Sequence, residues 1–319
     1  MTKIVQCVPN ISEGRDIKKI EYIIEPLKNQ AGFKLVSYEP DKDYNRTVVT
    51  LLGDPEAMLK PLVEFFKRAK EKIDMNKHQG EHPRMGAVDV TPFIPIANIK
   101  IAECVEHAKA LASMVWEEEI PVFLYARAAQ DPNRESLPNI RKGEFEGMKE
   151  KIKDPIWKPD YGKNEIHPTF GVAAIGARIP LIAYNIDLNT NDENIPKEIA
   201  KHIRQSSGGF QYVQAGPASL TERGHVQITM NILDVGKNPI YRIFETVRME
   251  AKRYNVNIMS SEVVGLIPKK ALLSTIQYYC ERDQIEFDPN MTIGQIVELG
   301  KKYLSLRDFE DLKIVEANL

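Results

Sequence analysis

Cysteine is scarce in this sequence of 319 residues, and long uncharged apolar runs are absent. The three cysteines, Cys7, Cys104 and Cys280, are widely spaced and form no C-x-x-C pair, which excludes a disulfide framework and a thiolate zinc site. No apolar run reaches the roughly 18 residues that a membrane-spanning helix needs. The first apolar stretch is broken by Gln6 and Pro9, unlike a secretory signal. We therefore expect a cytoplasmic protein with no membrane partner.

An excess of either charge is also missing. The chain has 43 Lys and Arg residues and 45 Asp and Glu residues, a formal net charge of -2. This balance provides no general attraction to nucleic-acid phosphates, so nucleic acid is not expected as a partner. Apolar residues, in contrast, are plentiful at 43%, enough for a sizeable core. The length favours two domains of roughly 150 residues each.

Common nucleotide and nucleophile motifs are absent as well. The sequence contains no G-x-G-x-x-G, no G-x-x-x-x-G-K-[ST] and no G-x-S-x-G. These absences argue against a dinucleotide-binding fold, a P-loop and the nucleophile elbow of an α/β-hydrolase. Candidate chemistry must therefore be sought in other polar segments.

Two halves of the sequence repeat one order of predicted elements. In the first half, short β-branched runs predict strands over residues 3–8, 33–38, 46–52 and 88–94, and amphipathic spacing predicts helices over 16–28 and 55–69. In the second half, strands are predicted over 181–188, 210–214, 225–232 and 256–264, and helices over 196–204 and 239–251. The shared order predicts an α/β (α+β) fold of two tandem ferredoxin-like βαββαβ sandwich subdomains. Further helices are expected over 101–116, 269–280 and 293–303, and a strand over 120–125.

A long stretch between the halves, residues 153–170, has almost no periodicity. It contains Pro155, Pro159, Gly162 and Pro168. Loops of this length in compact domains are usually functional or disordered. Because two aromatic residues lie within this one, we expect it to be ordered.

Two of the six histidines lie in one short segment, His78–His82. This segment matches the H-x-x-E-H pattern of inverted zinc metalloproteases, in which both histidines bind zinc from one face of a helix. Gly80 weakens such a helix, and Pro83 disfavours the helical conformation at His82. We therefore favour a rigid loop that presents His82 as an acid/base residue, with a solvated charged loop as the alternative.

A second polar segment precedes the strand that begins at Arg46. Three carboxylates, those of Glu39, Asp41 and Asp43, lie close to this arginine in the sequence. The segment could be an ordinary hairpin loop. In a βαββαβ sheet, however, it lies close to the same sheet end as the His82 segment, so a carboxylate, Arg46 and His82 could converge.

The sequence resembles the formiminotransferase family, which includes the transferase portion of formiminotransferase-cyclodeaminase. The blocks that carry the resemblance span nearly the whole chain in the family's order. They are Cys7–Gly14, Asn45–Val48, His78–Val90, Pro159–Gly162, Gly176–Arg178, Ala183–Ile186 and Gly265–Ala271. Such a set is far more specific than any single short motif.

The resemblance implies a reaction and an architecture. The family transfers a formimino group from N-formimidoyl-L-glutamate to N5 of tetrahydrofolate, giving L-glutamate and 5-formimidoyltetrahydrofolate in histidine degradation. It implies tetrahydrofolate as co-substrate, no metal, small-molecule partners and a homodimer. Two subdomains, here residues 1–178 and 179–319, would flank a substrate groove, and no cyclodeaminase domain is expected after them.

The resemblance also assigns site residues. The family's catalytic histidine falls on His82. From residue type and family position, we expect Asn10, Glu39, Arg46 and Arg84 to bind substrate, with Arg46 or Arg84 binding a substrate carboxylate. The folate-binding loop falls on Gly162, Lys163, Asn164, Glu165, Ile166, His167, Pro168, Thr169, Phe170 and Gly171. Glu39 occupies the position of a family aspartate, which keeps a carboxyl group with one extra methylene.

Two other functions stay open at this point. A formyl carbon at N5 of folate poses a similar acid/base problem, so the chain could act on 5-formyltetrahydrofolate as a cyclo-ligase or formyl transferase. It could also be a folate-binding module without turnover. Assays with both donors separate these possibilities.

Overall fold

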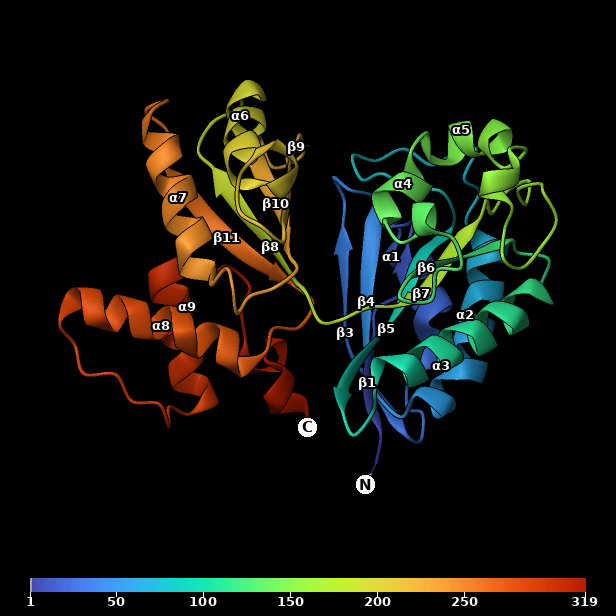
Figure 1. Cartoon of the computed structure of the whole chain (residues 1–319), viewed down its shortest axis with the longest axis horizontal. Helices are drawn as coiled ribbons and strands as arrows, with labels where there is room; N and C mark the ends of the chain where they lie inside the picture. The colour runs from blue at the N-terminus through green and yellow to red at the C-terminus, as the bar shows by residue number, and fades with distance from the viewer. Residues whose placement is uncertain (1) are drawn as a thin grey trace. The chain divides into compact units, whose positions relative to one another are not determined.

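The computed structural model describes residues 2–319, and their contacts separate two compact units (Figure 1). The first unit ends at Pro180, and the second is Leu181–Leu319. Each unit contains one β-sheet together with helices, which confirms the mixed α/β class predicted from the sequence.

The first unit is built on a sheet of seven strands. These are β1 (Ile4–Cys7), β2 (Asn10–Ile11), β3 (Phe33–Asp41), β4 (Arg46–Gly53), β5 (Val88–Ala97), β6 (Val122–Ala126) and β7 (Ala173–Ala177). Its helices are α1 (Ile17–Ile24), α2 (Pro55–Lys72), α3 (Ile101–Trp116), α4 (Leu137–Arg141) and α5 (Glu144–Lys151). The short helices α4 and α5 were not predicted, because neither is long enough to display a helical period.

In the first sheet, the strand that begins the predicted repeat pairs with the strand that ends it. β1 and β2 are two parts of one strand, interrupted at Pro9, and both pair antiparallel with β4 on one side and β5 on the other. β3 lies outside β4, and β7 and β6 extend the sheet beyond β5 in parallel. β7 was missed in the sequence because its alanines and glycine give little strand propensity. It forms because it is buried between two neighbours.

The two faces of this sheet are covered by different helices. One face packs against α1, α2 and α3 in the larger core, with Phe66 and Leu111 among its fully buried side chains. α2 and α3 lie side by side on it (Figure 1). At the β5–β7–β6 end, the other face packs against α4 and α5 through Ile140 and Met148. Polar residues on that second face of β4 and β2 are thus brought near α4.

The second unit has a sheet of four antiparallel strands. They are β8 (Ile182–Leu188), β9 (Val213–Leu220), β10 (His225–Ile232) and β11 (Ile258–Val264), and the sheet order is β11–β8–β10–β9. The helices are α6 (Asn194–Ile203), α7 (Ile240–Lys252), α8 (Lys269–Asp283) and α9 (Ile293–Leu304). All four contribute to one core around the fully buried Tyr184 and Phe244. Within residues 2–319, no helix has both the length and the apolar composition to cross a membrane.

The predicted strand over residues 210–214 was misplaced. The strand is Val213–Leu220, and it pairs along its whole length with β10. Its sequence includes Gly216 and Pro217, which have poor strand propensity, so the pattern gave no signal. Proline has no N–H to donate. It is tolerated here because β9 is an edge strand of this sheet, which has a neighbouring strand on one side only.

Candidate active site

The His78–His82 segment is a loop between α2 and β5. No helix forms there, so its two histidines do not stand one turn apart on a helical face, as the metalloprotease pattern requires. The loop packs directly on the β3–β4 turn. A Cβ on Gly80 would lie 2.4 Å from the carbonyl oxygen of Tyr44, a distance that no side chain can accommodate. Glycine at this position therefore allows the loop to touch the turn.

Hydrogen bonds fasten this loop to the same turn. Nε2 of His78 lies 2.8 Å from the carbonyl oxygen of Asn45, and the Asn45 side chain donates to the carbonyl of Gln79 at 2.9 Å. The amide of Glu81 donates to the carbonyl of Asp43 at 3.1 Å. Asn45 itself has a φ of +47°, a left-handed conformation that asparagine tolerates better than most residues. The position of His82 thus depends on the β3–β4 turn.

Arg84 closes the loop from its other end. This buried guanidinium donates from Nε to Nδ1 of His78 at 3.1 Å. Its two terminal nitrogens donate to Glu144 at 2.8 Å, to Glu146 at 2.7 and 2.6 Å, and to the carbonyl of His78 at 3.3 Å. All five N–H donors are therefore engaged within the unit, and none is left for a substrate carboxylate in this arrangement.

The contacts of His78 define its protonation state. Because Arg84 can only donate, Nδ1 of His78 accepts, which leaves the ring proton on Nε2 facing Asn45. Burial, with a contribution from the charge of Arg84, lowers the pKa of His78. His78 is thus a neutral ring held by two hydrogen bonds, and it has no nitrogen free for proton transfer.

His82 is partly buried in a different environment. Its ring lies 5.8 Å from the ring of Tyr44, and the Arg46 guanidinium lies 5.2 Å from that same Tyr44 ring. Burial is the main cause that holds the pKa of His82 well below the usual value, and the charges of Arg46 and Arg141 lower it further. The imidazole is therefore neutral near pH 7 and able to accept a proton.

Arg46 is the first residue of β4, and its guanidinium lies over the Tyr44 ring but forms no ion pair within residues 2–319. Its Nε is buried without a hydrogen-bond acceptor among residues 2–319. Asp41 faces it in the β3–β4 register, but a carboxylate oxygen of Asp41 accepts from the amide of Tyr44. Burial first, and then the charge of Arg141, lowers the pKa of Arg46. A buried guanidinium nitrogen without an acceptor is costly, and the charges of Asp41 and Asp89 offset this cost in part.

The sheet register places the remaining substrate-binding candidates near Arg46. Val48 of β4 pairs with Glu39 of β3 on one side and with Asn10 of β2 on the other. Residues paired in this way share a face, and Arg46 lies two positions before Val48, on that same face. Asn10, Glu39 and Arg46 therefore lie together on one face of the first sheet.

The expected folate loop divides into a surface part and a structural part. His167 and Gly171 form a tight turn through two backbone hydrogen bonds of 3.0 and 2.9 Å. Phe170 is fully buried and stacks against Phe66, so its ring faces the core. The backbone of the turn also binds the segment before His82, because the amide of Met75 donates to the carbonyl of Thr169 at 2.8 Å. The two loops are thus mechanically joined.

Two neighbouring pockets lie beside these loops. One, of about 620 Å³, is lined by Asn76, Phe145, Glu146, Lys149, Lys153, Asn164, Glu165, Ile166 and Pro168. The other, of about 660 Å³, is lined by residues 76–81, Arg84, Gly143, Glu144 and Glu146. Both volumes are within the range of small-ligand sites. Asn76 and Glu146 border both pockets, and His82 lines neither of them.

Sequence reasoning missed three residues of this region. Tyr44 was not singled out, although it lies in the polar segment before Arg46. Asp89 lies within the His78–Val90 block, and it accepts hydrogen bonds from Arg141 and from the amide of Met85. Arg141 had no signal in the sequence, because it ends a short helix with no motif and reaches the site only through the fold.

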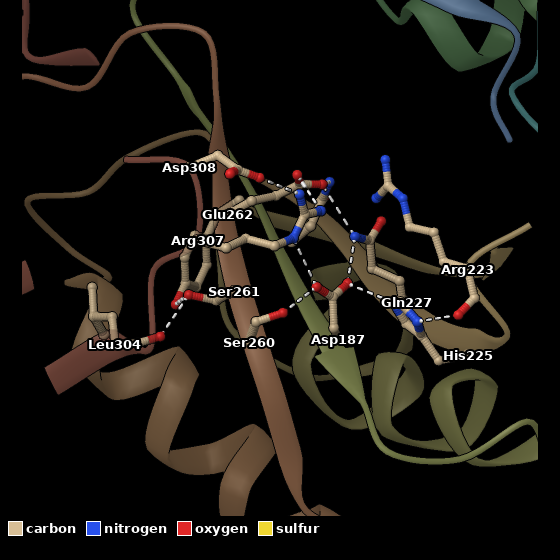
Figure 2. A network of polar contacts seen from close by, with 12 residues as sticks. Asp187, Arg223, His225, Gln227, Ser260, Ser261, Glu262, Leu304, Arg307 and Asp308 are labelled. Carbon is tan, nitrogen blue, oxygen red and sulfur yellow. Dashed lines mark hydrogen bonds and ion pairs between the residues drawn. The ribbon is translucent and has the colours of Figure 1, made fainter. Parts of the chain in front are cut away.

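The second unit contains a separate buried polar network (Figure 2). Asp187 is 1% exposed, and it accepts from Gln227 at 2.8 Å, Ser260 at 2.6 Å and Arg307 at 3.0 Å. Arg307 also forms an ion pair with Glu262. Burial alone would raise the pKa of Asp187, but the hydrogen bond from Ser260 and the charge of Arg307 hold it below its usual value. Arg307 is therefore the cation that neutralises this network.

Comparison with known proteins places both units in one family. The family model of the formiminotransferase domain, N-terminal subdomain, matches residues 4–178, and that of the formiminotransferase domain matches residues 183–317. The glutamate formimidoyltransferase of Streptococcus pyogenes serotype M1 is 46% identical over 90% of this chain and 96% of its own length. The glutamate formimidoyltransferase of Thermoplasma acidophilum is 43% identical over 87% and 92%. The formimidoyltransferase-cyclodeaminase of Mus musculus is 39% identical over 89% of this chain and 54% of its own length.

Proposed function

The chain belongs to the formiminotransferase family, and we propose that it transfers the formimino group from N-formimidoyl-L-glutamate to N5 of tetrahydrofolate. The products are L-glutamate and 5-formimidoyltetrahydrofolate. The single observation that supports this most strongly is that one ring, Tyr44, lies 5.8 Å from the ring of the half-buried His82 and 5.2 Å from the Arg46 guanidinium, whose Nε is buried without an acceptor among residues 2–319. A transfer between two nitrogens needs a proton acceptor, and an anionic donor needs a cation.

We propose His82 as the residue that moves the proton. N5 attacks the carbon of the protonated formimino group, the π electrons of its C=N bond move to the terminal nitrogen, which becomes a neutral NH2 group, and N5 then carries one proton too many. His82 accepts that proton and delivers it to the glutamate nitrogen. The bond from the carbon to this nitrogen then breaks with its electron pair going to nitrogen, and the C=N bond is restored. A neutral histidine is suited to the first of these proton transfers.

The other site residues take roles that follow from their chemistry. A protonated formimino group is cationic, so the carboxylate of Glu39 stabilises it, and the Asn10 amide adds a polar contact on the same sheet face. Arg46 binds a carboxylate of the donor. Arg84 has no free donor, so we assign it a positioning role in place of the substrate contact expected from the sequence.

We propose that tetrahydrofolate uses the pocket of about 620 Å³ beside residues 162–171. Asn164, Glu165, Ile166 and Pro168 line it, which agrees with the loop assignment, whereas Phe170 serves the core. Lys149 and Lys153 on the opposite wall supply positive charge for the folate glutamyl carboxylates. The pocket of about 660 Å³ continues from it along residues 76–81 of the His82 loop.

We further propose the ferredoxin-like description of the repeat and a homodimeric, cytoplasmic enzyme. In the second unit the order β11–β8–β10–β9 is fourth, first, third, second along the chain. The first unit has the same order when β1 and β2 count as its first strand and β3, β4 and β5 follow. This agreement of strand order supports two ferredoxin-like sandwiches, with β7 and β6 added to the first.

A direct assay tests the function. The protein is incubated with N-formimidoyl-L-glutamate and tetrahydrofolate, and 5-formimidoyltetrahydrofolate is measured by chromatography; a parallel reaction supplies 5-formyltetrahydrofolate with ATP. We expect product only from the first. In His82→Ala the rate should fall by about 10²–10⁴-fold. His202→Ala, on the exposed surface of α6, is the matched control.

Two outcomes would reject this proposal. Turnover of 5-formyltetrahydrofolate alone would indicate the cyclo-ligase or formyl-transfer alternative. Binding of tetrahydrofolate without product from either donor would indicate a folate-binding module. Near wild-type transfer by His82→Ala would remove His82 from the mechanism while leaving the transfer itself intact.

A further inference from the structure

Arg141, the last residue of α4, contributes a second guanidinium to the region of His82. Its side chain is 15% exposed. It donates from Nε to a carboxylate oxygen of Asp89 at 2.9 Å, and a second nitrogen of the same guanidinium contacts the same oxygen. The other oxygen of Asp89 accepts from the amide of Met85 at 2.8 Å. Asp89 therefore holds Arg141 while it is itself fixed by the end of the His82 loop.

The sheet register places Arg46 and Asp89, the partner of Arg141, on the strands that flank β2. Val90, next to Asp89, pairs with Asn10, and Asn10 pairs with Val48 of β4. Arg46 lies two residues before Val48 on that strand. The Arg46 and Asp89 strands are thus separated by two strand spacings, roughly 10 Å. Arg141 contacts Asp89 from α4, and its charge acts on both Arg46 and His82, so the two guanidiniums are close enough to bind one small ligand.

The guanidinium donors in this region are not all used. Asp89 neutralises Arg141, while Arg46 makes no ion pair with any of residues 2–319. Nε and one terminal nitrogen of Arg141 bind Asp89, and its remaining terminal nitrogen has no hydrogen bond within those residues. The two guanidiniums lie near each other, and both have free donors. Together they can therefore bind more than one carboxylate group.

Resting on the function proposed above, we propose that Arg46 and Arg141 bind the two carboxylates of the formimidoyl donor, one each. Asp89 acts as the positioning residue for Arg141. The arginine pair then determines specificity, since a donor with a single carboxylate leaves one buried guanidinium unpaired. Arg141 is thus a residue that selects a dicarboxylate donor.

Tetrahydrofolate also ends in a glutamyl group with two carboxylates. The geometry of the folate argues against binding of that group by Arg46 and Arg141. In the donor, both carboxylates lie within a few bonds of the formimino nitrogen, so they stay near His82 during the reaction. In folate, the glutamyl group is separated from N5 by the aminobenzoyl ring. A folate whose N5 is beside His82 cannot place its glutamyl end there as well.

The test compares two donors in three variants. N-formimidoyl-L-glutamate and N-formimidoylglycine, which lacks the side-chain carboxylate, are each assayed for kcat/KM at saturating tetrahydrofolate with wild type, Arg46→Gln and Arg141→Gln. Arg253→Gln, at the exposed end of α7, is the control. We expect one variant to lower kcat/KM about tenfold or more for the glutamate donor only. The other should lower both donors, because it binds the carboxylate that they share.

The outcomes separate this inference from the function on which it rests. If wild type transfers from neither donor, the function fails. If wild type transfers but Arg141→Gln matches Arg253→Gln, or if both site variants lower both donors in equal proportion, the inference is wrong. A rise in the KM for tetrahydrofolate in Arg141→Gln, with unchanged donor discrimination, would reassign Arg141 to the folate glutamyl end and also reject it.

A conservative variant guards against misfolding. Arg141→Lys keeps the charge but loses the fork that binds Asp89 and a carboxylate together. It should show a discrimination between the two donors intermediate between wild type and Arg141→Gln. Wild-type discrimination in Arg141→Lys, combined with an unfolded Arg141→Gln as judged by circular dichroism, would show that only the fold needs this position.

Discussion

Arg46 and Arg141 act on His82 through their charge as well as through any ligand that they bind. Both lower the pKa of His82, in addition to the larger effect of burial. A histidine that is neutral at physiological pH can accept a proton at once, which the first step of amine attack requires. The two arginines proposed to bind the donor would thus also keep the proposed base neutral.

This coupling predicts the pH dependence of the rate. Because the pKa of His82 is lowered, the base stays neutral below the ordinary histidine value of about 6.5, so the acid limb of kcat/KM should lie below that pH. Removing the positive charge of Arg46 raises the pKa of His82, so Arg46→Gln should shift the acid limb to higher pH. Rate profiles between pH 4.5 and 8 for wild type, Arg46→Gln and the surface variant Arg253→Gln provide the measurement. An acid limb that is unmoved in Arg46→Gln contradicts this coupling.

At the scale of elements, the His82 loop is held from two sides. The β3–β4 turn binds it through Asn45 and Asp43, and α5 binds it through the ion pairs of Arg84 with Glu144 and Glu146. The sequence predicted a loop here from Gly80 and Pro83. It did not predict α5, whose two glutamates engage Arg84, and so it assigned Arg84 to the substrate.

The positioning role of Arg84 has a kinetic signature. Lysine cannot reproduce the forked contact with Glu146 and the bond to His78, so Arg84→Lys should lower kcat by about tenfold, the equivalent of one lost charge-assisted hydrogen bond. The KM for the donor should change little, because the loop and not the ligand is affected. Steady-state kinetics beside Arg253→Lys measure both values. A large rise in donor KM with unchanged kcat would return Arg84 to substrate binding.

The contact between the loop and the β3–β4 turn can be tested at Gly80. Gly80→Ala introduces a Cβ that would lie 2.4 Å from the Tyr44 carbonyl oxygen, so the loop must move, at a cost of about 1–3 kcal/mol. Activity should fall along with stability, because His82 moves with the loop. Gly294→Ala is the matched control in α9, where nothing lies within 4 Å, and it should gain up to about 1 kcal/mol. Urea unfolding measures the stability of both variants. Equal stabilities of Gly80→Ala and Gly294→Ala would contradict the close contact.

At the scale of the whole molecule, residues 2–319 form no shared core, because the buried clusters of the first unit and that of the second are each built within one unit. The first unit buries Phe66 and Leu111 beneath α2 and α3, and the second buries Tyr184 and Phe244 beneath its helices. Ion pairs also form within each unit. Arg84 is paired with two glutamates in the first unit, and Arg307 neutralises Asp187 and Glu262 in the second.

The network in the second unit predicts a pH-dependent loss of stability (Figure 2). Arg307→Gln leaves Asp187 and Glu262 without their cation, and we expect it to cost about 2–3 kcal/mol at pH 7, somewhat less than a fully buried pair because Arg307 is 26% exposed. The lowered pKa of Asp187 stabilises the wild type above the unfolded value of about 3.9, and that stability is lost as the pH falls. The difference between variant and wild type should therefore persist from pH 7 to about pH 4 and shrink as the pH falls further. Urea unfolding at pH 7 and below pH 4 measures it, with Arg253→Gln expected to cost less than about 1 kcal/mol. A difference that stays constant with pH would show that the ion pair is not its cause.

The amino-acid pattern by itself determined the mixed α/β class of the fold and the loop nature of residues 78–82. These features follow from local periodicity and from helix-disfavouring residues such as Gly80 and Pro83, so they can be read one segment at a time. The same pattern failed at β7 and β9, where small residues and a proline form strands only because neighbours pair with them. Their structure depends on partners distant in sequence.

Only the tertiary structure decided which charges meet around His82. Arg141 and Asp89 are far apart along the chain and come together where α4 packs against the sheet, and Arg84 is occupied by glutamates of a helix that follows much later. An isolated segment cannot reveal whether its arginine is free or neutralised, because that depends on which carboxylates the fold brings within hydrogen-bonding distance. The sequence thus proposed His82, and the fold determined that the Nε of Arg46 is buried without an acceptor among residues 2–319.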